Sequence, residues 1–115
     1  MKHKPKNLVD QVITILEDKL VEDIVAFDVQ GKNPLTDTVI LGSVNNTRKM
    51  QAVLDAIRQQ SKDPTFPFRH AEGQPESGWM LIDLGDVILH LFSPEMRAQV
   101  EVERILTRIV TPSKN

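Results

Sequence analysis

Cysteine is absent from the 115 residues of this chain. There is therefore no disulfide framework and no thiolate to bind a metal or act as a nucleophile, and a cytosolic location fits this composition. Long apolar runs are also missing, because polar side chains such as Asp10 and Glu17 interrupt the apolar residues that follow the basic segment Met1 to Lys6. We therefore expect neither a signal peptide nor a membrane span, and we predict a soluble, cytoplasmic protein.

A strong charge of either sign is absent too, since the formal net charge is −2 at pH 7. Proteins that bind phosphate backbones or anionic membranes usually carry a strongly basic domain or patch. We therefore expect little direct contact with nucleic acid and no membrane partner. The composition, with 40% hydrophobic and 26% charged residues, is typical of a globular protein. The length suits one compact domain, so residues 1–115 are predicted to form a single domain.

The most informative segment of the chain is a predicted β-hairpin. Two apolar runs of strand length, Gly78 to Asp83 and Val87 to Phe92, follow each other closely. The residues between them have turn chemistry: Leu84, Gly85 and Asp86. Only His90 interrupts the second run, which is therefore predicted to be an inner strand covered on both sides. Ser93 can cap a helix that begins directly after this strand.

Hydrophobic periodicity predicts the remaining elements. They are a helix of about three turns from Leu8, strands Ile24–Val29 and Thr38–Val44, a helix from Asn45 or Asn46 to Asp63, an edge strand within Phe66–Glu72, a loop from Gly73 to Gly78, a third helix through Ala98 to Ile109, and a polar tail from Thr111 to Asn115. The two hairpins should be antiparallel, and the crossover through the second helix allows a parallel pairing between them. The predicted fold is α/β (α+β), with a single mixed β-sheet of about five strands and helices packed on it.

A glycine and a serine stand where a nucleotide-binding site would begin. Gly42 and Ser43 lie at the end of a predicted strand, ahead of a capped helix, which resembles the start of a nucleotidyltransferase active site. The pair of acidic residues that would hold magnesium is missing, because the first acid downstream is Asp55, without an acidic partner two residues away. We therefore assign no catalytic residue, no metal and no cofactor. A nucleotide-binding or nucleotidyltransferase-like enzyme that uses Ser43 and Lys32 stays the alternative.

Two aspartates and a histidine surround the hairpin turn. Asp83 and Asp86 could share a metal ion, but aspartate at a turn more commonly accepts hydrogen bonds from backbone amides two residues on. We favour this structural role over a metal site. His90 needs a hydrogen-bond partner within its apolar strand, since an unsatisfied buried polar group costs about 1 to 3 kcal/mol. Asp83 or Asp86 is the expected partner of His90.

The chain has one tryptophan, Trp79, which begins the first strand of the hairpin. Side chains alternate along a strand, so Trp79 shares a face with Leu81 and Asp83. One interpretation is that Trp79 closes the end of the core. The other is that it anchors a protein partner, a role in which tryptophan is enriched. We favour the anchor, because the other strand residues already supply an apolar interior.

Short motifs along nearly the whole chain form a specific combination. They are the loop Asp28-Val29-Gln30-Gly31-Lys32, Thr36-Asp37, Asn46-Thr47-Arg48, Glu72-Gly73, Trp79, the turn with Gly85-Asp86, His90 and Arg97. In this order and at these distances, they resemble the ribosomal silencing factors, the RsfS or Iojap family.

This resemblance implies a fold related to nucleotidyltransferases without their catalytic acids, and a protein that is not an enzyme. It implies binding to the large ribosomal subunit, through its fourteenth protein, and a steric block of small-subunit joining when nutrients are scarce. A homodimer of the free protein is compatible with it. We assign partner binding to five residues: Trp79, Leu81, Asp83, Leu84 and Lys32. We assign a structural role in the turn and its hydrogen-bond network to Gly85, Asp86 and His90.

Overall fold

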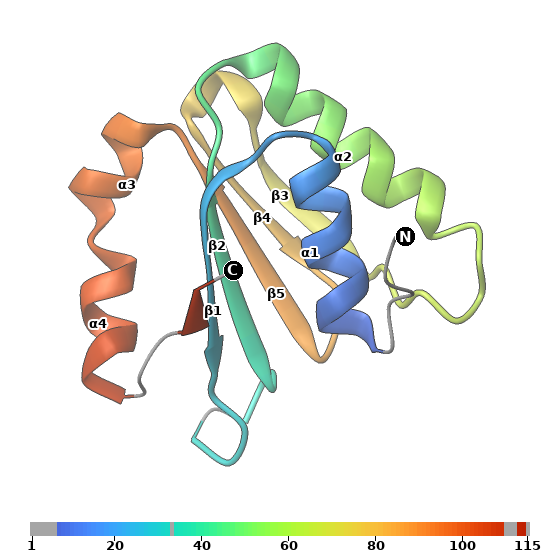
Figure 1. Cartoon of the computed structure of the whole chain (residues 1–115), viewed down its shortest axis with the longest axis horizontal. Coiled ribbons are helices and arrows are strands. Elements are labelled where there is room, and N and C mark those ends of the chain that lie inside the picture. The colour runs from blue at the N-terminus through green and yellow to red at the C-terminus, as the bar shows by residue number, and fades with distance from the viewer. Residues whose placement is uncertain (1–6, 33, 110–112, 115) are drawn as a thin grey trace.

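In the computed structural model, which describes residues 7–32, 34–109 and 113–114, helices lie on a single twisted sheet (Figure 1). In chain order the elements are α1 (Leu8–Asp18), β1 (Glu22–Asp28), β2 (Thr38–Ser43), α2 (Thr47–Gln60), β3 (His70–Gln74), the short 3-10 helix η1 (Pro75–Ser77), β4 (Trp79–Asp83), β5 (Val87–Phe92), α3 (Pro94–Val100), α4 (Val102–Ile109) and β6 (Ser113–Lys114). The strand order in the sheet is β3-β4-β5-β2-β1-β6.

The pairing of the strands makes the sheet mixed, as predicted. β1 and β2 pair antiparallel, as do β3 with β4 and β4 with β5. β2 and β5 run parallel, from Thr38 opposite Val87 to Ser43 opposite Phe92. The chain reaches β5 through α2, β3 and β4, so this one parallel pair joins the two hairpins. The expected fold class is confirmed, with the two-residue β6 added at the edge beside β1.

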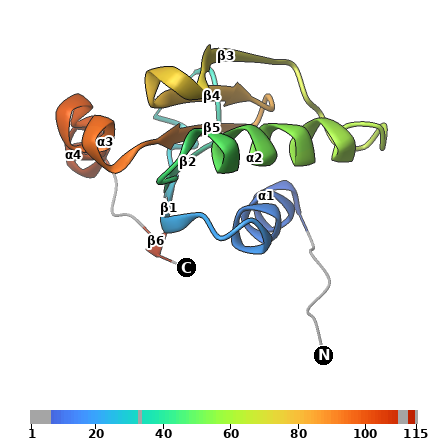
Figure 2. The same cartoon turned by 90° about the horizontal axis from the view of Figure 1, so that it is seen from above.

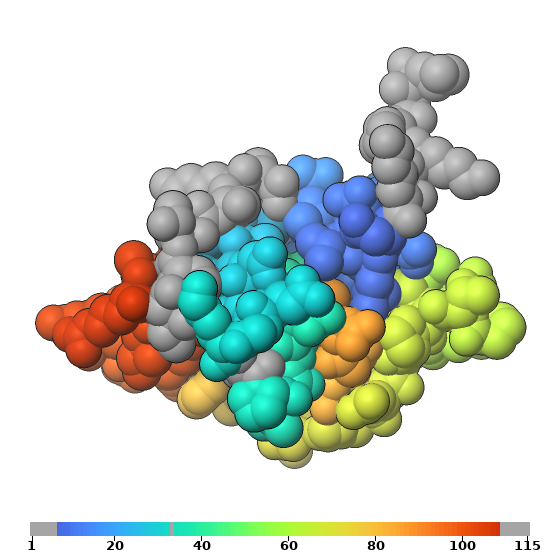
Figure 3. All heavy atoms as spheres, turned by 90° about the horizontal axis from the view of Figure 1, so that it is seen from below, coloured from blue at the N-terminus to red at the C-terminus, as the bar shows by residue number. Residues whose placement is uncertain are grey.

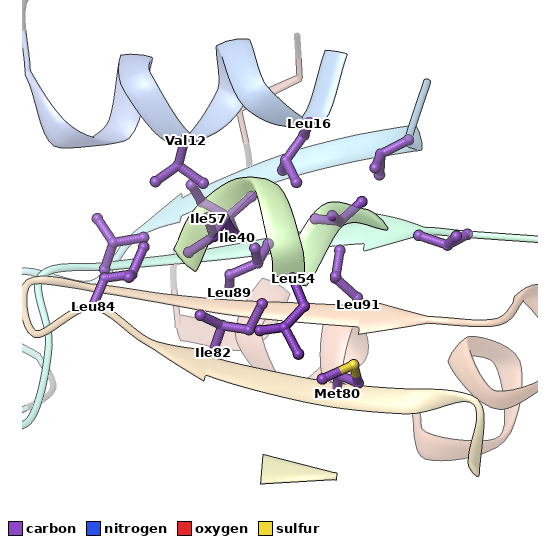
Figure 4. Close-up of a cluster of buried hydrophobic side chains, with 14 of the residues drawn as sticks. Val12, Leu16, Ile40, Leu54, Ile57, Met80, Ile82, Leu84, Leu89 and Leu91 are labelled. Carbon is purple, nitrogen blue, oxygen red and sulfur yellow. The ribbon is translucent and has the colours of Figure 1, made fainter. Parts of the chain in front are cut away.

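The larger hydrophobic core lies between one face of the sheet and the helices α1 and α2 (Figures 2 and 4). Both helices begin at an asparagine whose side-chain oxygen accepts a backbone N–H, Asn7 from Asp10 and Asn46 from Lys49. Their apolar stripes then meet every second residue of the strands. Fully buried residues of this core include Val12, Leu16, Ile40, Ile57, Ile82, Leu84, Leu89 and Leu91. Among the described residues, no helix is both long and apolar enough to cross a membrane.

The opposite face of the sheet carries a smaller core beneath α3 and α4. It is built from residues such as Phe27, Leu41, Phe92 and Leu106. The single third helix that was predicted here is wrong, because the helix breaks between α3 and α4. Glu101 adopts a left-handed conformation (φ 57°) and its N–H donates to the carbonyl of Arg97, which ends α3. Leu106 can thereby reach the sheet while Ile105 stays exposed.

Other boundaries differ from the prediction as well, most of all at β3 and at the C-terminus. The edge strand begins only at His70, because Pro67 has no N–H to donate to a ladder and Phe66 is buried instead. This strand runs on to Gln74, where a loop was expected. Ser113 and Lys114, expected in a polar tail, pair with Ala26 and Val25 of β1. Thr111 and Asn115 lie outside the described residues.

A glycine in β3 allows β3 and β4 to approach closely. Gly73 has a φ of +86°, and a Cβ atom there would lie 2.4 Å from the backbone carbonyl oxygen of Trp79. Gly31 has a similar φ of +80° but no atom within 4 Å of the same position. Alanine at either position would be strained, because the backbone there is left-handed. Only alanine at position 73 would also collide with backbone atoms of β4.

We expect Gly31→Ala to lower the free energy of unfolding by about 1 kcal/mol, the usual cost of a left-handed non-glycine residue. Gly73→Ala should cost clearly more, because β3 must also move away from β4. Urea denaturation of the two variants measures this difference. Equal losses would show that the contact at Gly73 is relaxed without cost.

Candidate functional site

The candidate site is centred on Trp79, at the start of β4. The burial of β4 alternates, with Met80 and Ile82 buried and Trp79, Leu81 and Asp83 half-buried on the other face. The ring of Trp79 packs against Phe92, with 5.3 Å between ring centroids. Its indole N–H donates to Nδ1 of His90 at 3.1 Å. Trp79 is thus part of the smaller core and, at the same time, part of the surface.

The hydrogen bond from Trp79 determines which ring nitrogen of His90 is unprotonated. Tryptophan can only donate, so Nδ1 of His90 must be the unprotonated acceptor. Burial lowers the pKa of His90 to about 4, which keeps the ring neutral at pH 7. The ring also stacks on Phe92, at a centroid distance of 5.8 Å and an interplanar angle of 6°. The predicted bond from His90 to Asp83 or Asp86 is wrong: the His90 ring bonds Trp79, and Asp83 contacts Gly85 and His70 instead.

The turn aspartates have separate tasks in the structure. One carboxylate oxygen of Asp83 accepts the backbone N–H of Gly85 at 2.8 Å, and the other lies 3.6 Å from Nδ1 of His70. Asp86 acts through its backbone carbonyl, which accepts the N–H groups of Asp37 and Thr38 at 3.1 and 3.0 Å. Within the part of the chain that the structure describes, no three His, Cys, Asp or Glu side chains group closely enough to hold a metal ion.

A hollow of about 400 Å³ lies beside Trp79, between the edge of the sheet and α3. Trp79, Leu81 and Met96 give it apolar walls, and Gly73 and Ser77 also line it. The carboxylate of Glu72 stands in the lining, within 2.9 Å of Nε2 of His70. The hollow is thus apolar with one acidic group, which suits an apolar side chain of a ligand or partner.

The structure brings together only some of the residues assigned to a partner. Trp79, Leu81 and Asp83 share a face, as the alternation predicted. Leu84 continues the alternation of Met80 and Ile82 and is fully buried under the helices, so it offers no surface to a partner. Lys32 is exposed in the β1–β2 loop. This loop lies next to the β4–β5 turn (Figure 3), and the strand pairing puts both at the opposite end of the strands from Trp79.

Ser43 is held by a residue to which sequence reasoning gave no role. Arg97 of α3 donates to Ser43 Oγ at 2.9 Å and to the backbone carbonyl of Asp23 at 2.9 Å. Its guanidinium also pairs with Glu103 at 3.0 Å, and its side chain is only 13% exposed. Because Ser43 and Lys32 lie at opposite ends of β2, the structure does not assemble the phosphate site of the alternative enzyme. The sequence signal that could have indicated this role is the position of Arg97 between acidic residues, with Glu95 before it and Glu103 after it.

This is a small α/β protein whose sheet is covered by two helices on one face and only partly covered on the other. The aromatic cluster on the partly covered face is a candidate binding surface. A family model described as "Ribosomal silencing factor during starvation" matches residues 2–112. The chain therefore belongs to the ribosomal silencing factor (RsfS) family.

Individual relatives agree with this assignment. The chain is 31% identical over 101 residues to a ribosomal silencing factor RsfS from Zymomonas mobilis, covering 88% of this chain and 76% of that protein. Identity to the RsfS protein of Bacillus subtilis is 29% over 100 residues, covering 87% and 85%. A mouse protein named "Mitochondrial assembly of ribosomal large subunit protein 1" is 26% identical, covering 86% of this chain and 45% of the mouse protein.

Solved structures show the same fold. A crystal structure from Chromobacterium violaceum superposes with a TM-score of 0.81 at 23% identity, covering 91% of this chain and 88% of that one. Another from Bacillus halodurans gives a TM-score of 0.74 at 26% identity, covering 85% and 91%.

The low pKa of His90 predicts how stability depends on pH. At pH values between the ordinary pKa of 6.5 and the folded pKa of about 4, His90 is protonated in the unfolded chain but stays neutral in the folded chain. The contribution of His90 to the free energy of unfolding is therefore fully present above pH 6.5. It falls, by at most about 1.4 kcal/mol per pH unit, as the pH drops toward 4. Urea denaturation of the wild type from pH 7 to 4 measures the slope.

His90→Asn is the matched control, because its amide oxygen can still accept from Trp79 but does not titrate. The carboxylates contribute equally to both proteins, so the difference between the two curves isolates His90. Parallel curves for wild type and variant would show that His90 does not carry the pH dependence.

Proposed function

We propose that this protein binds the large ribosomal subunit through its fourteenth protein and sterically prevents the small subunit from joining. It then represses translation in the cytoplasm when nutrients are limiting, without catalysing a reaction. Support comes from the family description, which names silencing of ribosomes during starvation. The mouse relative, whose name refers to assembly of the large subunit, points to the same particle.

The single observation that carries the binding surface is the half-buried Trp79 on the partly covered face. Tryptophan is enriched among residues that dominate the energy of protein interfaces. Leu81 stands two positions along the same face, and both residues line the apolar hollow. A protein partner can desolvate this largely apolar surface, while the carboxylate of Glu72 at its rim keeps its contact with His70. We therefore place the partner over Trp79, Leu81 and the hollow, and leave Leu84 and Lys32 out of this surface.

Subunit joining tests the proposed function directly. Purified large subunits are incubated with the protein, small subunits are added, and sucrose gradients measure the assembled ribosomes. We expect the protein to sediment with large subunits and to reduce assembly in proportion to its occupancy, because one surface cannot hold two partners. Failure of the wild-type protein to sediment with large subunits at micromolar concentration would contradict the proposal.

The contribution of Trp79 is tested by Trp79→Ala. We expect binding to large subunits to weaken by about 2 kcal/mol or more, roughly 30-fold in Kd, as at an interface hot spot. The folding free energy should fall by less than the about 3 to 5 kcal/mol typical of an interior aromatic, because the ring is only half-buried. Sedimentation titration and urea denaturation of the same sample give both quantities.

Phe68→Ala is the matched control for Trp79→Ala. Phe68 is also a half-buried aromatic, but it packs against the larger core, on the side of α1 and α2. Its loss should reduce stability to a similar extent and leave binding unchanged. If both variants lose binding equally, the effect reflects general destabilisation and Trp79 is not an anchor.

A further inference from the structure

The hydrogen bond between Trp79 and His90 fixes which ring nitrogen of His90 carries the proton. Because Nδ1 accepts from the indole N–H at 3.1 Å, the neutral ring must carry its proton on Nε2. The ring cannot exchange tautomers without breaking this bond. Stacking on Phe92 from the neighbouring part of the strand further restricts its rotation. His90 is therefore an oriented N–H donor rather than a freely titrating side chain.

The donor on Nε2 has no acceptor within the described part of the chain. The His90 side chain makes one hydrogen bond with the described residues, the one at Nδ1. Among the described residues, no side-chain nitrogen or oxygen is both buried from solvent and without a partner. The Nε2 atom must therefore reach solvent, although most of the ring is covered. A polar atom at the surface of an apolar cluster can hydrogen-bond water in the free protein.

The position of His90 places this donor at the proposed binding surface. His90 lies directly opposite Leu81 in the sheet and diagonally next to Trp79, on the same face. A partner that covers Trp79 and Leu81 displaces water from the Nε2–H group. Burying an N–H group without an acceptor costs about 1 to 3 kcal/mol, so the partner must supply an acceptor if it is to bind tightly.

Building on the proposed function, we propose that His90 Nε2–H donates a hydrogen bond to an oxygen acceptor of the bound ribosomal protein, held in position by Trp79. The acceptor is an oxygen atom of a protein, such as a main-chain carbonyl. An RNA phosphate is disfavoured, because a neutral histidine brings no positive charge to such a contact. His90 is thus a specificity-determining residue that rejects surfaces without an acceptor at this position.

The test uses His90→Asn in the full chain, with purified large subunits as the ligand. The amide oxygen of asparagine replaces Nδ1 as acceptor for Trp79 but does not reach the position of the Nε2–H group. We expect the fluorescence emission of Trp79, the only tryptophan, to stay like that of the wild type, and the Kd to rise roughly fivefold to tenfold. Because no net charge is lost, the ratio of the two Kd values should not change with salt concentration.

A second substitution removes the donor with less change in shape. Thiazolylalanine at position 90, with its ring nitrogen in place of Nδ1, keeps the aromatic ring and the acceptor but has sulfur in place of Nε2–H. It should weaken binding as His90→Asn does. Gln59→Ala, on the exposed side of α2, is the control that should change neither readout.

Three results would overturn the inference. They are wild-type binding by both position-90 variants, a binding loss that appears only together with altered Trp79 emission, and a Kd ratio that falls steeply with added salt. The first would leave the proposed function intact, since the wild type would still bind. Absence of wild-type binding would instead refute the proposed function itself.

Discussion

The parallel pairing of β2 with β5 is the constraint on which the rest of the structure depends. Each strand belongs to a different antiparallel hairpin, and only this seam joins the hairpins into one sheet. A parallel pair requires a crossover, and that crossover includes α2, which covers the larger core. Both strands are central and nearly wholly apolar, with Ile40, Leu41 and Leu89 fully buried. The seam also determines which residues lie on the partly covered face.

The candidate site follows from the asymmetry between the two faces of this sheet. On the face toward α1 and α2, side chains of β4 and β5 are excluded from water. On the other face the same strands present half-buried side chains, where a polar atom can be mostly covered and still reach solvent. His90 and Trp79 use this intermediate environment: the apolar surroundings keep the imidazole neutral, and each ring satisfies one polar atom of the other. Either side chain alone in this place would need a different partner.

Most helices and strands were predicted correctly, because turn residues, helix caps and hydrophobic periodicity act over only a few neighbouring residues. The β4–β5 hairpin, the asparagine cap of α2 and the order of strands and helices were readable from turn residues and periodicity. The break at Glu101 was not, because the apolar stripe continues through it and only tertiary packing of Leu106 selects the left-handed residue. In the site, the face shared by Trp79 and Leu81 was predictable. The partner of His90 was not, because the acidic turn residues are nearer to it in sequence than Trp79, which bonds it diagonally across the hairpin.

The two edges of the sheet have consequences for association between strands of different molecules. A free strand edge is a template for another chain, and native proteins blunt such edges with charges, irregularities or short covering segments. At one edge, β3 carries His70 and Glu72 and bends at Gly73, so it is a poor template. At the other edge, Ser113 and Lys114 occupy the hydrogen-bonding positions beside Ala26 and Val25. Because these two residues already pair with β1, that edge presents fewer free N–H and C=O groups to a strand of another molecule.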